Sequence, residues 1–237
     1  MISASLNYLR ESDNAIKTTA IGGLLFILSV LLVPLIFVSG YLMRVLRQTA
    51  SGNDEPPVFD DWGNLGVDGL KATAISLVYT FVPLVILGIV GVFGIGVAFS
   101  GLGDSAIGGL IGGTVVFLLV ALGFVLSIAG AYVTPAALSN FAETDRLTAG
   151  FDLGLIWTVI TTKTYAVGWL SAMAVILAGA VVVGVLSVVP ILGTLAGLFV
   201  QFYALVAAFY IFGHTWKDIR PVATKQSEPN TVEQSAV

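Results

Sequence analysis

The sequence predicts an all-α fold, a polytopic transmembrane helical bundle with about five spans. Apolar residues make up 57% of the 237 residues and charged residues only 10%, whereas a soluble domain carries about 25% charged residues. The mean hydropathy is +0.99. The charges are also segregated, which leaves uncharged runs at 18–43, 72–103, 105–142 and 164–216. About 20 apolar residues cross a bilayer core, so every run is long enough for a span.

The predicted spans follow these runs in order. They cover about 18–43, 72–98, 106–134, 164–188 and 191–213. The second and third are joined by a short turn at 100–106, and a proline at 190 opens the fifth, where a helix tolerates it. Together they form a single transmembrane domain over 1–220. A polar tail at 221–237 has little apolar content to bury, so we expect it to be disordered.

The positions of Lys and Arg predict the orientation, because cytoplasmic loops carry an excess of both. With five spans, one side holds Arg10 and Lys17, and the other side holds the remaining eight. This difference places the loops 44–71 and 135–163 and the C-terminus in the cytoplasm. The N-terminus is then outside, and the protein is a multi-pass protein of the cell membrane.

One similarity within the chain favours a different topology for the first predicted span. Lys17-Thr-Thr-Ala-Ile resembles Lys71-Ala-Thr-Ala-Ile, and equivalence would make 17–44 a re-entrant hairpin kinked at Pro34. A helix over 17–44 reaches only about 40 Å, enough for one crossing and not for two. We therefore retain the single crossing as the prediction.

The two polar loops point to an internal duplication. Phe59-Asp60 and Phe151-Asp152 each precede a lysine by the same interval, and the two copies are 92 residues apart, from Phe59 to Phe151 and from Lys71 to Lys163. A Tyr near the end of the preceding span recurs at a nearly equal offset. Parallel repeats of this kind occur in transporter folds, and plain duplication also produces them.

The stretch GNDEPPVFDDWGN, residues 52–64, is the main candidate site. In a structural interpretation, Asp60 or Asp61 caps a helix, the other carboxylates offset nearby arginines, and Phe59 and Trp62 anchor the loop among headgroups. In a functional interpretation, the same four residues form a docking surface for a partner. A divalent-cation site is a third reading, although the carboxylates lack the spacing of a known calcium loop.

The second loop, over 135–155, favours a short amphipathic helix on the membrane surface. Its apolar positions are Ala137, Leu138, Phe141, Leu147 and Phe151. A surface connector without a ligand explains the same pattern.

Few polar groups lie inside the predicted spans. Gln201, near the centre of the fifth, is a candidate for an interhelical hydrogen bond or for a substrate contact. Tyr79, near Pro83, is a candidate for a small cavity. Glycines at the turn ends of both helical hairpins predict close helix contacts there.

Several classes of site are not expected. The chain has no Cys and a single His, so a Cys-ligated or multi-histidine metal site is excluded, and no cofactor is predicted. No metalloprotease helix motif or nucleophile elbow is present, so we do not expect an enzyme. The net charge of −4 gives no basic footprint for nucleic acid.

The most distinctive segments are PPVFDDWG, then DGLK, and later PAALSNFAETDRLTAGFDLG. With the apolar run before them, over about 5–215, they resemble the haloarchaeal membrane proteins grouped as domain of unknown function 4013. The resemblance implies a membrane location and a salt-loving archaeal source, and it transfers no activity. The family is also distantly similar to membrane domains attached to glycerophosphodiester phosphodiesterases.

Two functions follow as expectations. The first is a non-enzymatic scaffold or partner-docking protein, embedded in the lipid bilayer, that binds a cytoplasmic or membrane protein. The alternative is a permease or channel for a small neutral or lipid-like solute.

Overall fold

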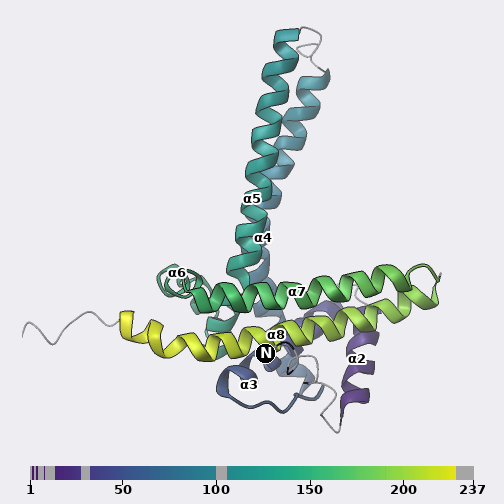
Figure 1. Ribbon diagram of the computed structural model, residues 1–237, viewed down its shortest axis with the longest axis vertical. Helices are drawn as coiled ribbons and strands as arrows, with labels where there is room; N and C mark the ends of the chain where they lie inside the picture. Colours follow the sequence, from purple (N-terminus) through teal and green to yellow (C-terminus); the bar gives the residue numbers. More distant parts are fainter. Residues whose placement is uncertain are drawn as a thin grey trace, which may run out of the picture. The chain divides into compact units, whose positions relative to one another are not determined.

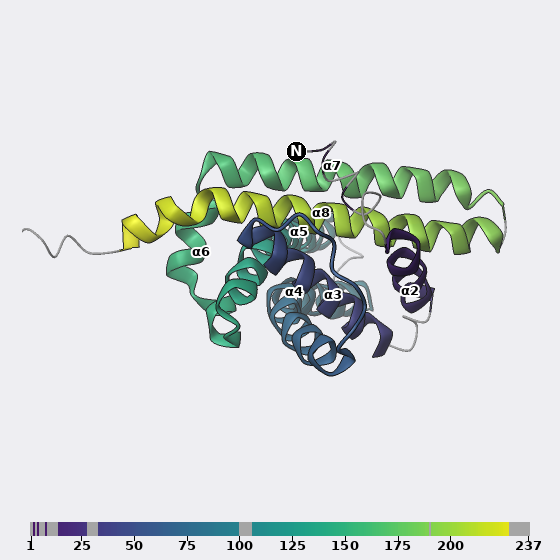
Figure 2. The same ribbon diagram turned by 90° about the horizontal axis from the view of Figure 1, so that it is seen from below.

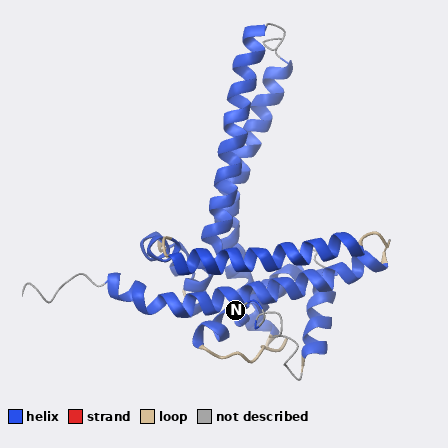
Figure 3. Cartoon of the chain, viewed as in Figure 1, coloured by secondary structure: helices blue, strands red, loops and turns tan. Residues whose placement is uncertain are grey.

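The computed structural model describes residues 2, 4, 8, 14–27, 33–99, 106–189 and 191–227 (Figure 1). Over this part of the chain every regular element is a helix and no strand occurs (Figure 3), which confirms the all-α fold. The elements are α2 (Ala15–Ile27), α3 (Val33–Ser51), α4 (Trp62–Phe99), α5 (Ala106–Thr144), the 3-10 helix η3 (Leu147–Phe151), α6 (Leu153–Ile160), α7 (Lys163–Leu186) and α8 (Leu192–Ser227).

The chain forms two compact units. The first unit contains residues 1–73 and 135–237, and the second unit contains residues 74–134. Helices α4 and α5 each contribute to both units, because each is close to forty residues long.

Four helices are long and apolar enough to cross a membrane, which supports a multi-pass membrane protein. The windows are Trp62–Gly94, Gly112–Thr144, Lys163–Leu186 and Leu192–Arg220. They correspond to the second to fifth predicted spans, but α4 begins ten residues before Ala72 and α5 continues ten residues past Thr134. Lys71 therefore lies inside α4 and does not open it, contrary to the expectation from the duplicated pattern.

The first predicted span, 18–43, is not one of these four helices. Its residues are divided between α2 and α3, and residues 28–32 lie outside the described part of the chain. Helix α3 packs against α8, and α2 packs against both. Tyr41, Val45 and Leu46 of α3 are fully buried, so protein covers much of α3. Hydropathy measures apolar content alone, so it does not distinguish a helix that is surrounded by protein from a helix that is surrounded by lipid.

Helices α7 and α8 form an antiparallel hairpin in the first unit, and both views show them side by side (Figure 2). A Cβ on Gly193 would overlap the Leu186 carbonyl, and one on Gly197 would lie 3.0 Å from Val183 Cγ1. Small residues therefore allow close packing at the turn end of this hairpin, as predicted.

The second unit is the outer part of the α4–α5 hairpin. At the turn end, a Cβ on Gly94 would lie 3.6 Å from Val116 Cγ2, an ordinary contact between the two helices, whereas one on Gly88, Gly91, Gly96 or Gly113 would meet nothing within 4 Å. The helices approach more closely elsewhere. A Cβ on Gly123 would lie 2.5 Å from Leu87, and one on Gly130 would lie 2.6 Å from the Tyr79 carbonyl oxygen.

The predicted C-terminal tail begins within α8, which continues to Ser227. The rest of it, residues 228–237, lies outside the described residues. Disorder of this tail therefore stays a prediction.

Candidate functional site

Loop 52–61 connects α3 to α4 in the first unit and is fastened to α3 along its length. The Tyr41 hydroxyl donates to the Pro57 carbonyl at 3.1 Å. One turn further along α3, Arg44 donates to the carbonyl oxygens of Val58 at 3.4 Å and Asp61 at 3.1 Å. The guanidinium of Arg44 also pairs with the Asp60 carboxylate. Backbone carbonyls that would otherwise need water are thus satisfied by α3, which holds the loop in one path.

The aromatic residues of the loop divide into a buried one and an exposed one. Phe59 is 7% exposed and stacks on Tyr41, with ring centroids 4.3 Å apart. Trp62 stacks on Phe59 at 5.9 Å and meets the edge of Phe37, yet stays 45% exposed. Phe59 is therefore a core residue and not a headgroup anchor, because Tyr41 and Phe202 enclose it. Trp62 alone of the two presents a free aromatic surface.

The two aspartates of the candidate site have structural roles. Asp61 precedes α4 with a φ of 42°, and its carboxylate accepts hydrogen bonds from the Asn64 backbone N–H at 3.4 Å and from the Asn64 amide at 2.5 Å. This is the predicted helix cap, and the Asn64 side chain lowers the pKa of the Asp61 carboxyl. Asp60 pairs with Arg44 while its side chain remains 66% exposed.

Arg47 gathers three helices in a cluster that the sequence did not reveal. Its Nε donates to the Ala142 carbonyl at 3.0 Å, its Nη1 to Asp68 at 3.0 Å and its Nη2 to Asp145 at 3.4 Å. Lys71 lies 3.8 Å from the same oxygen of Asp145. Asp68 is buried, so Arg47 compensates a carboxylate that has lost most of its water. In the sequence, Asp68 and Asp145 fall in the two predicted loops, 44–71 and 135–163, and nothing there pairs one loop with the other.

A further ion pair links α5 to the C-terminal part of α8. Glu143 accepts a hydrogen bond from Trp216 Nε1 at 2.7 Å and pairs with Arg220 Nε at 2.6 Å. A cavity of about 200 Å³ adjoins this pair. Its lining comes from α5, α6 and α8: Asn140, Glu143, Thr144, Leu155, Val159, Trp216 and Arg220. We refer to loop 52–61, the Arg47 cluster and the Glu143 pair together as the polar face.

Tyr8 also belongs to the polar face. Its hydroxyl donates to the Glu55 carbonyl at 3.4 Å, and its ring lies 4.4 Å from the Tyr210 ring. Burial raises the pKa of the Tyr8 phenol above its ordinary value. Next to it, His214 Nε2 lies 3.1 Å from Asp54. The N-terminal segment therefore reaches loop 52–61 at Tyr8.

The predicted surface helix over 135–155 is placed differently. Ala137, Leu138 and Phe141 are buried in the extension of α5. The short surface elements follow later, as η3 and α6, and Asp152 caps α6 by accepting from the Leu155 N–H at 3.1 Å. The first three predicted positions thus mark the buried face of a longer helix, whereas Leu147 and Phe151 lie in η3 and are 40% and 38% exposed.

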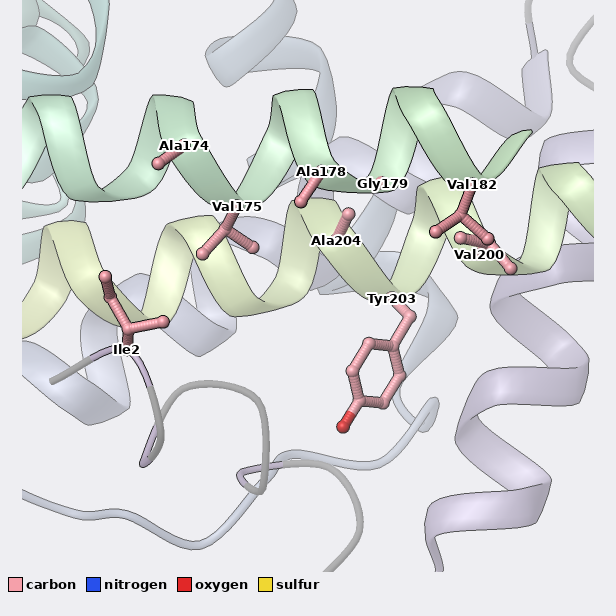
Figure 4. Close-up of a pocket in the computed structure, with 9 residues that line it drawn as sticks. All are labelled: Ile2, Ala174, Val175, Ala178, Gly179, Val182, Val200, Tyr203 and Ala204. Carbon is pink, nitrogen blue, oxygen red and sulfur yellow. The ribbon is translucent and has the colours of Figure 1, made fainter. Parts of the chain in front are cut away.

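The intramembrane candidates lie beside apolar cavities. Gln201 is half-buried on α8 in the first unit. A groove of about 300 Å³ between α7 and α8 is lined by its neighbours, and the Tyr203 hydroxyl points away from α7 (Figure 4). Tyr79, in the second unit, lines a cavity of about 310 Å³ with Pro83 and Gly130. Apart from a tyrosine, each lining consists of aliphatic residues, proline or glycine.

The carboxylates of the polar face pair with protein groups, namely arginines, a lysine, a histidine and a tryptophan. Among the residues that the structure describes, no group of three or more His, Cys, Asp or Glu side chains converges on a point that could hold a metal ion.

Four apolar helices with an ordered polar face define the class as a multi-pass helical membrane protein. The chain belongs to the family described as Protein of unknown function (DUF4013), which matches residues 24–189. This confirms the family resemblance, and the archaeal and halophilic source stays a prediction. No curated protein and no solved structure matches the chain.

Proposed function

We propose that the protein is a non-enzymatic multi-pass membrane protein whose polar face docks a protein partner at the cytoplasmic membrane surface. The observation that carries this proposal is the distribution of polar contacts. Long-range side-chain hydrogen bonds and ion pairs gather on the polar face, whereas two cavities of about 300 and 310 Å³ beside the spanning helices have apolar linings.

The form of loop 52–61 supports a docking role. Its backbone is fastened by Tyr41 and Arg44, while Trp62, Glu55 and Asp60 are exposed. Binding to a loop that is already fixed costs less conformational entropy than binding to a loop that becomes ordered only in the complex. Exposed tryptophans are also enriched among the residues that dominate binding energy. We therefore centre the docking surface on Trp62.

The orientation proposed here differs from the one that five spans predict. Tyr8 contacts Glu55, so the N-terminal segment and loop 52–61 share one side of the membrane. With four crossings, by α4, α5, α7 and α8, both termini lie on that side. All 10 Lys and Arg then lie on it as well, and an excess of Lys and Arg marks the cytoplasmic side. Helices α2 and α3 enter from the cytoplasm without crossing.

Cysteine labelling tests this orientation without background, because the chain has no Cys. Ala4→Cys probes the N-terminal segment, and Ser187→Cys probes the turn between α7 and α8. An impermeant maleimide added to intact cells should label position 187 and should label position 4 only after permeabilisation. Labelling of Ala4→Cys in intact cells would restore the five-span orientation.

Cross-linking in native membranes, followed by pull-down and mass spectrometry, tests the docking function. The Trp62→Ala variant should lose a partner that the unsubstituted protein recovers. Phe117→Ala is the matched control, because Phe117 is also an exposed aromatic residue but lies on α5 in the second unit, and it should retain the partner. Recovery of no specific partner, or equal recovery with Trp62→Ala, would contradict the proposal.

A second candidate function is supported by the cavity beside Tyr79 and Pro83. Its apolar lining suits a lipid-like solute better than a polar one. Purified protein should then retain a lipid in native mass spectrometry, and Ala129→Phe, which fills the cavity, should release it. Identical lipid retention in both proteins would remove this alternative.

A further inference from the structure

We infer that the outer face of α6, formed by Leu153 and Trp157, is a lipid-binding surface that inserts into the headgroup layer of the membrane. Helix α6 lies crosswise to α7 in both views of the first unit (Figures 1 and 2). Helix α7 is long and apolar enough to cross a membrane. A helix that lies crosswise at the end of a spanning helix runs along the membrane surface.

The corner between α6 and α7 is built by two threonines. Helix α6 ends at Ile160 with Thr161 as its C-cap, and Thr162 is extended, with a ψ of 143°, which breaks the helical path. Thr162 then caps α7 by accepting from the Tyr165 N–H at 3.2 Å. The capped start of α7 makes the change of direction a built feature of the chain.

The two faces of α6 are both apolar, but only one has a protein partner. Ile156 and Val159 are buried in the first unit. Leu153 and Trp157 are one turn apart on the other face, and each is 67% exposed. A short helix exposed to water on this face would carry polar residues instead. Tryptophan favours the headgroup layer, where its ring meets apolar chains and its N–H meets water.

Exposed apolar residues on the flanking elements support lipid as the occupant. Val167 and Leu170 of α7 and Phe151 of η3 are also exposed. Two exposed cations, Arg146 and Lys163, flank the segment. Cations at this level can meet lipid phosphates while apolar neighbours enter the acyl region. The surface therefore fits a bilayer that contains anionic phospholipids.

Spin labelling of single cysteines tests this assignment, again without native Cys. Leu153→Cys is compared with Val181→Cys on the exposed face of α7 and with Ser51→Cys at the exposed end of α3. All three are reconstituted into vesicles of phosphatidylcholine and phosphatidylglycerol. Oxygen, which enters lipid, and a water-soluble nickel chelate then compete for the label.

The label at position 153 should collide with oxygen more than the label at 51 does, and with the nickel chelate several-fold less. Its depth should fall between those of positions 51 and 181. A label at 153 as accessible to the nickel chelate as the one at 51 would overturn the inference. If Leu153→Cys fails to reconstitute, Trp157→Cys on the same face is read in the same way.

Discussion

The two units of the chain obtain their order in different ways. In the first unit, Tyr41, Phe141 and Phe202 are fully buried, and charged side chains connect α3, α4, α5 and α8. In the second unit, large apolar side chains such as Phe81, Phe93, Phe117 and Phe124 are exposed. Only 6% of the apolar window of α5 is buried, compared with 50% of that of α8.

This difference shows where the sequence specifies particular contacts. Within the second unit the exposed surface requires only apolar character, which lipid or a neighbouring helix satisfies, so many substitutions are compatible with it. In the first unit, close helix contacts and buried charges accept few alternatives. Sensitivity to substitution should therefore be concentrated in the first unit.

Paired glycine substitutions should give the largest contrast between the units. A Cβ on Gly69 would overlap the Ile36 carbonyl, whereas a Cβ on Gly91 would meet nothing within 4 Å. Backbone overlap forces α3 and α4 apart, so Gly69→Ala should lower the free energy of unfolding by about 3 kcal/mol or more. Denaturation in detergent micelles measures it.

Gly91→Ala is the matched control, because helix propensity alone favours Ala over Gly by up to about 1 kcal/mol. It should leave the midpoint unchanged or raise it. Equal losses at both positions would show that the second unit is as tightly specified as the first.

Removal of Arg47 should have the next largest effect. Arg47→Met leaves buried Asp68 without its donor and frees the Ala142 carbonyl. Breaking a buried pair costs about 3–5 kcal/mol, but Arg47 is 37% exposed, so solvent screening reduces the expected loss to about 2 kcal/mol. Arg146→Met, at an exposed position, is the control and should be nearly neutral.

The double variant Arg47→Met with Asp68→Leu separates charge from packing. It should recover part of the stability, because the unpaired carboxylate is gone. No recovery would mean that Arg47 acts through packing and through Ala142 alone.

The sequence predicted the helices better than it predicted their neighbours. Uncharged length identified α4, α5, α7 and α8, because a bilayer core imposes a minimum span. The same measure did not show that α3, within the predicted span 18–43, is buried against protein, and aromatic character placed Phe59 among headgroups although Tyr41 covers it. Apolar character predicts that a residue avoids water, but it does not show whether lipid or protein surrounds the residue.

Polar contacts were predictable where they are local. Asp61 caps α4 through Asn64, and Asp152 caps α6 through Leu155, although the predicted repeat makes Asp60, one residue earlier, the equivalent of Asp152. The duplication itself stays a prediction. The bond from Arg47 to Ala142 joins residues 95 positions apart, and one sequence contains no signal for such a pair.

Glu143→Gln should have a smaller effect on the first unit. The amide oxygen can still accept from Trp216, but the ion pair with Arg220 is lost. Arg220 is 55% exposed, and exposed ion pairs contribute about 0.2–1 kcal/mol, so a loss of about 0.5 kcal/mol is expected. Tryptophan fluorescence should follow unfolding, and Glu55→Gln in the exposed loop is the control. A loss above that of Arg47→Met would reverse the ranking of the two clusters.

The smallest effect should come from acid acting on Asp61. Because the folded pKa of Asp61 lies below its ordinary value, its charge stabilises the fold above about pH 3.9, the pKa expected in an unfolded chain. That stabilisation is lost as the pH falls through the lower folded pKa. Asp61→Asn keeps a capping oxygen and removes the charge, so its midpoint should be lower at pH 7 and should converge with that of the unsubstituted protein in acid.

A parallel pH series on Gly91→Ala makes this a test of the two units. No Asp, Glu, Lys, Arg or His occurs at 74–99 or 106–134, the described part of the second unit. Any change at Gly91 should therefore give a midpoint difference that does not vary with pH, whereas the Asp61→Asn difference should disappear. A constant Asp61→Asn difference would assign the cap to hydrogen bonding alone and remove its charge from the stability of the first unit.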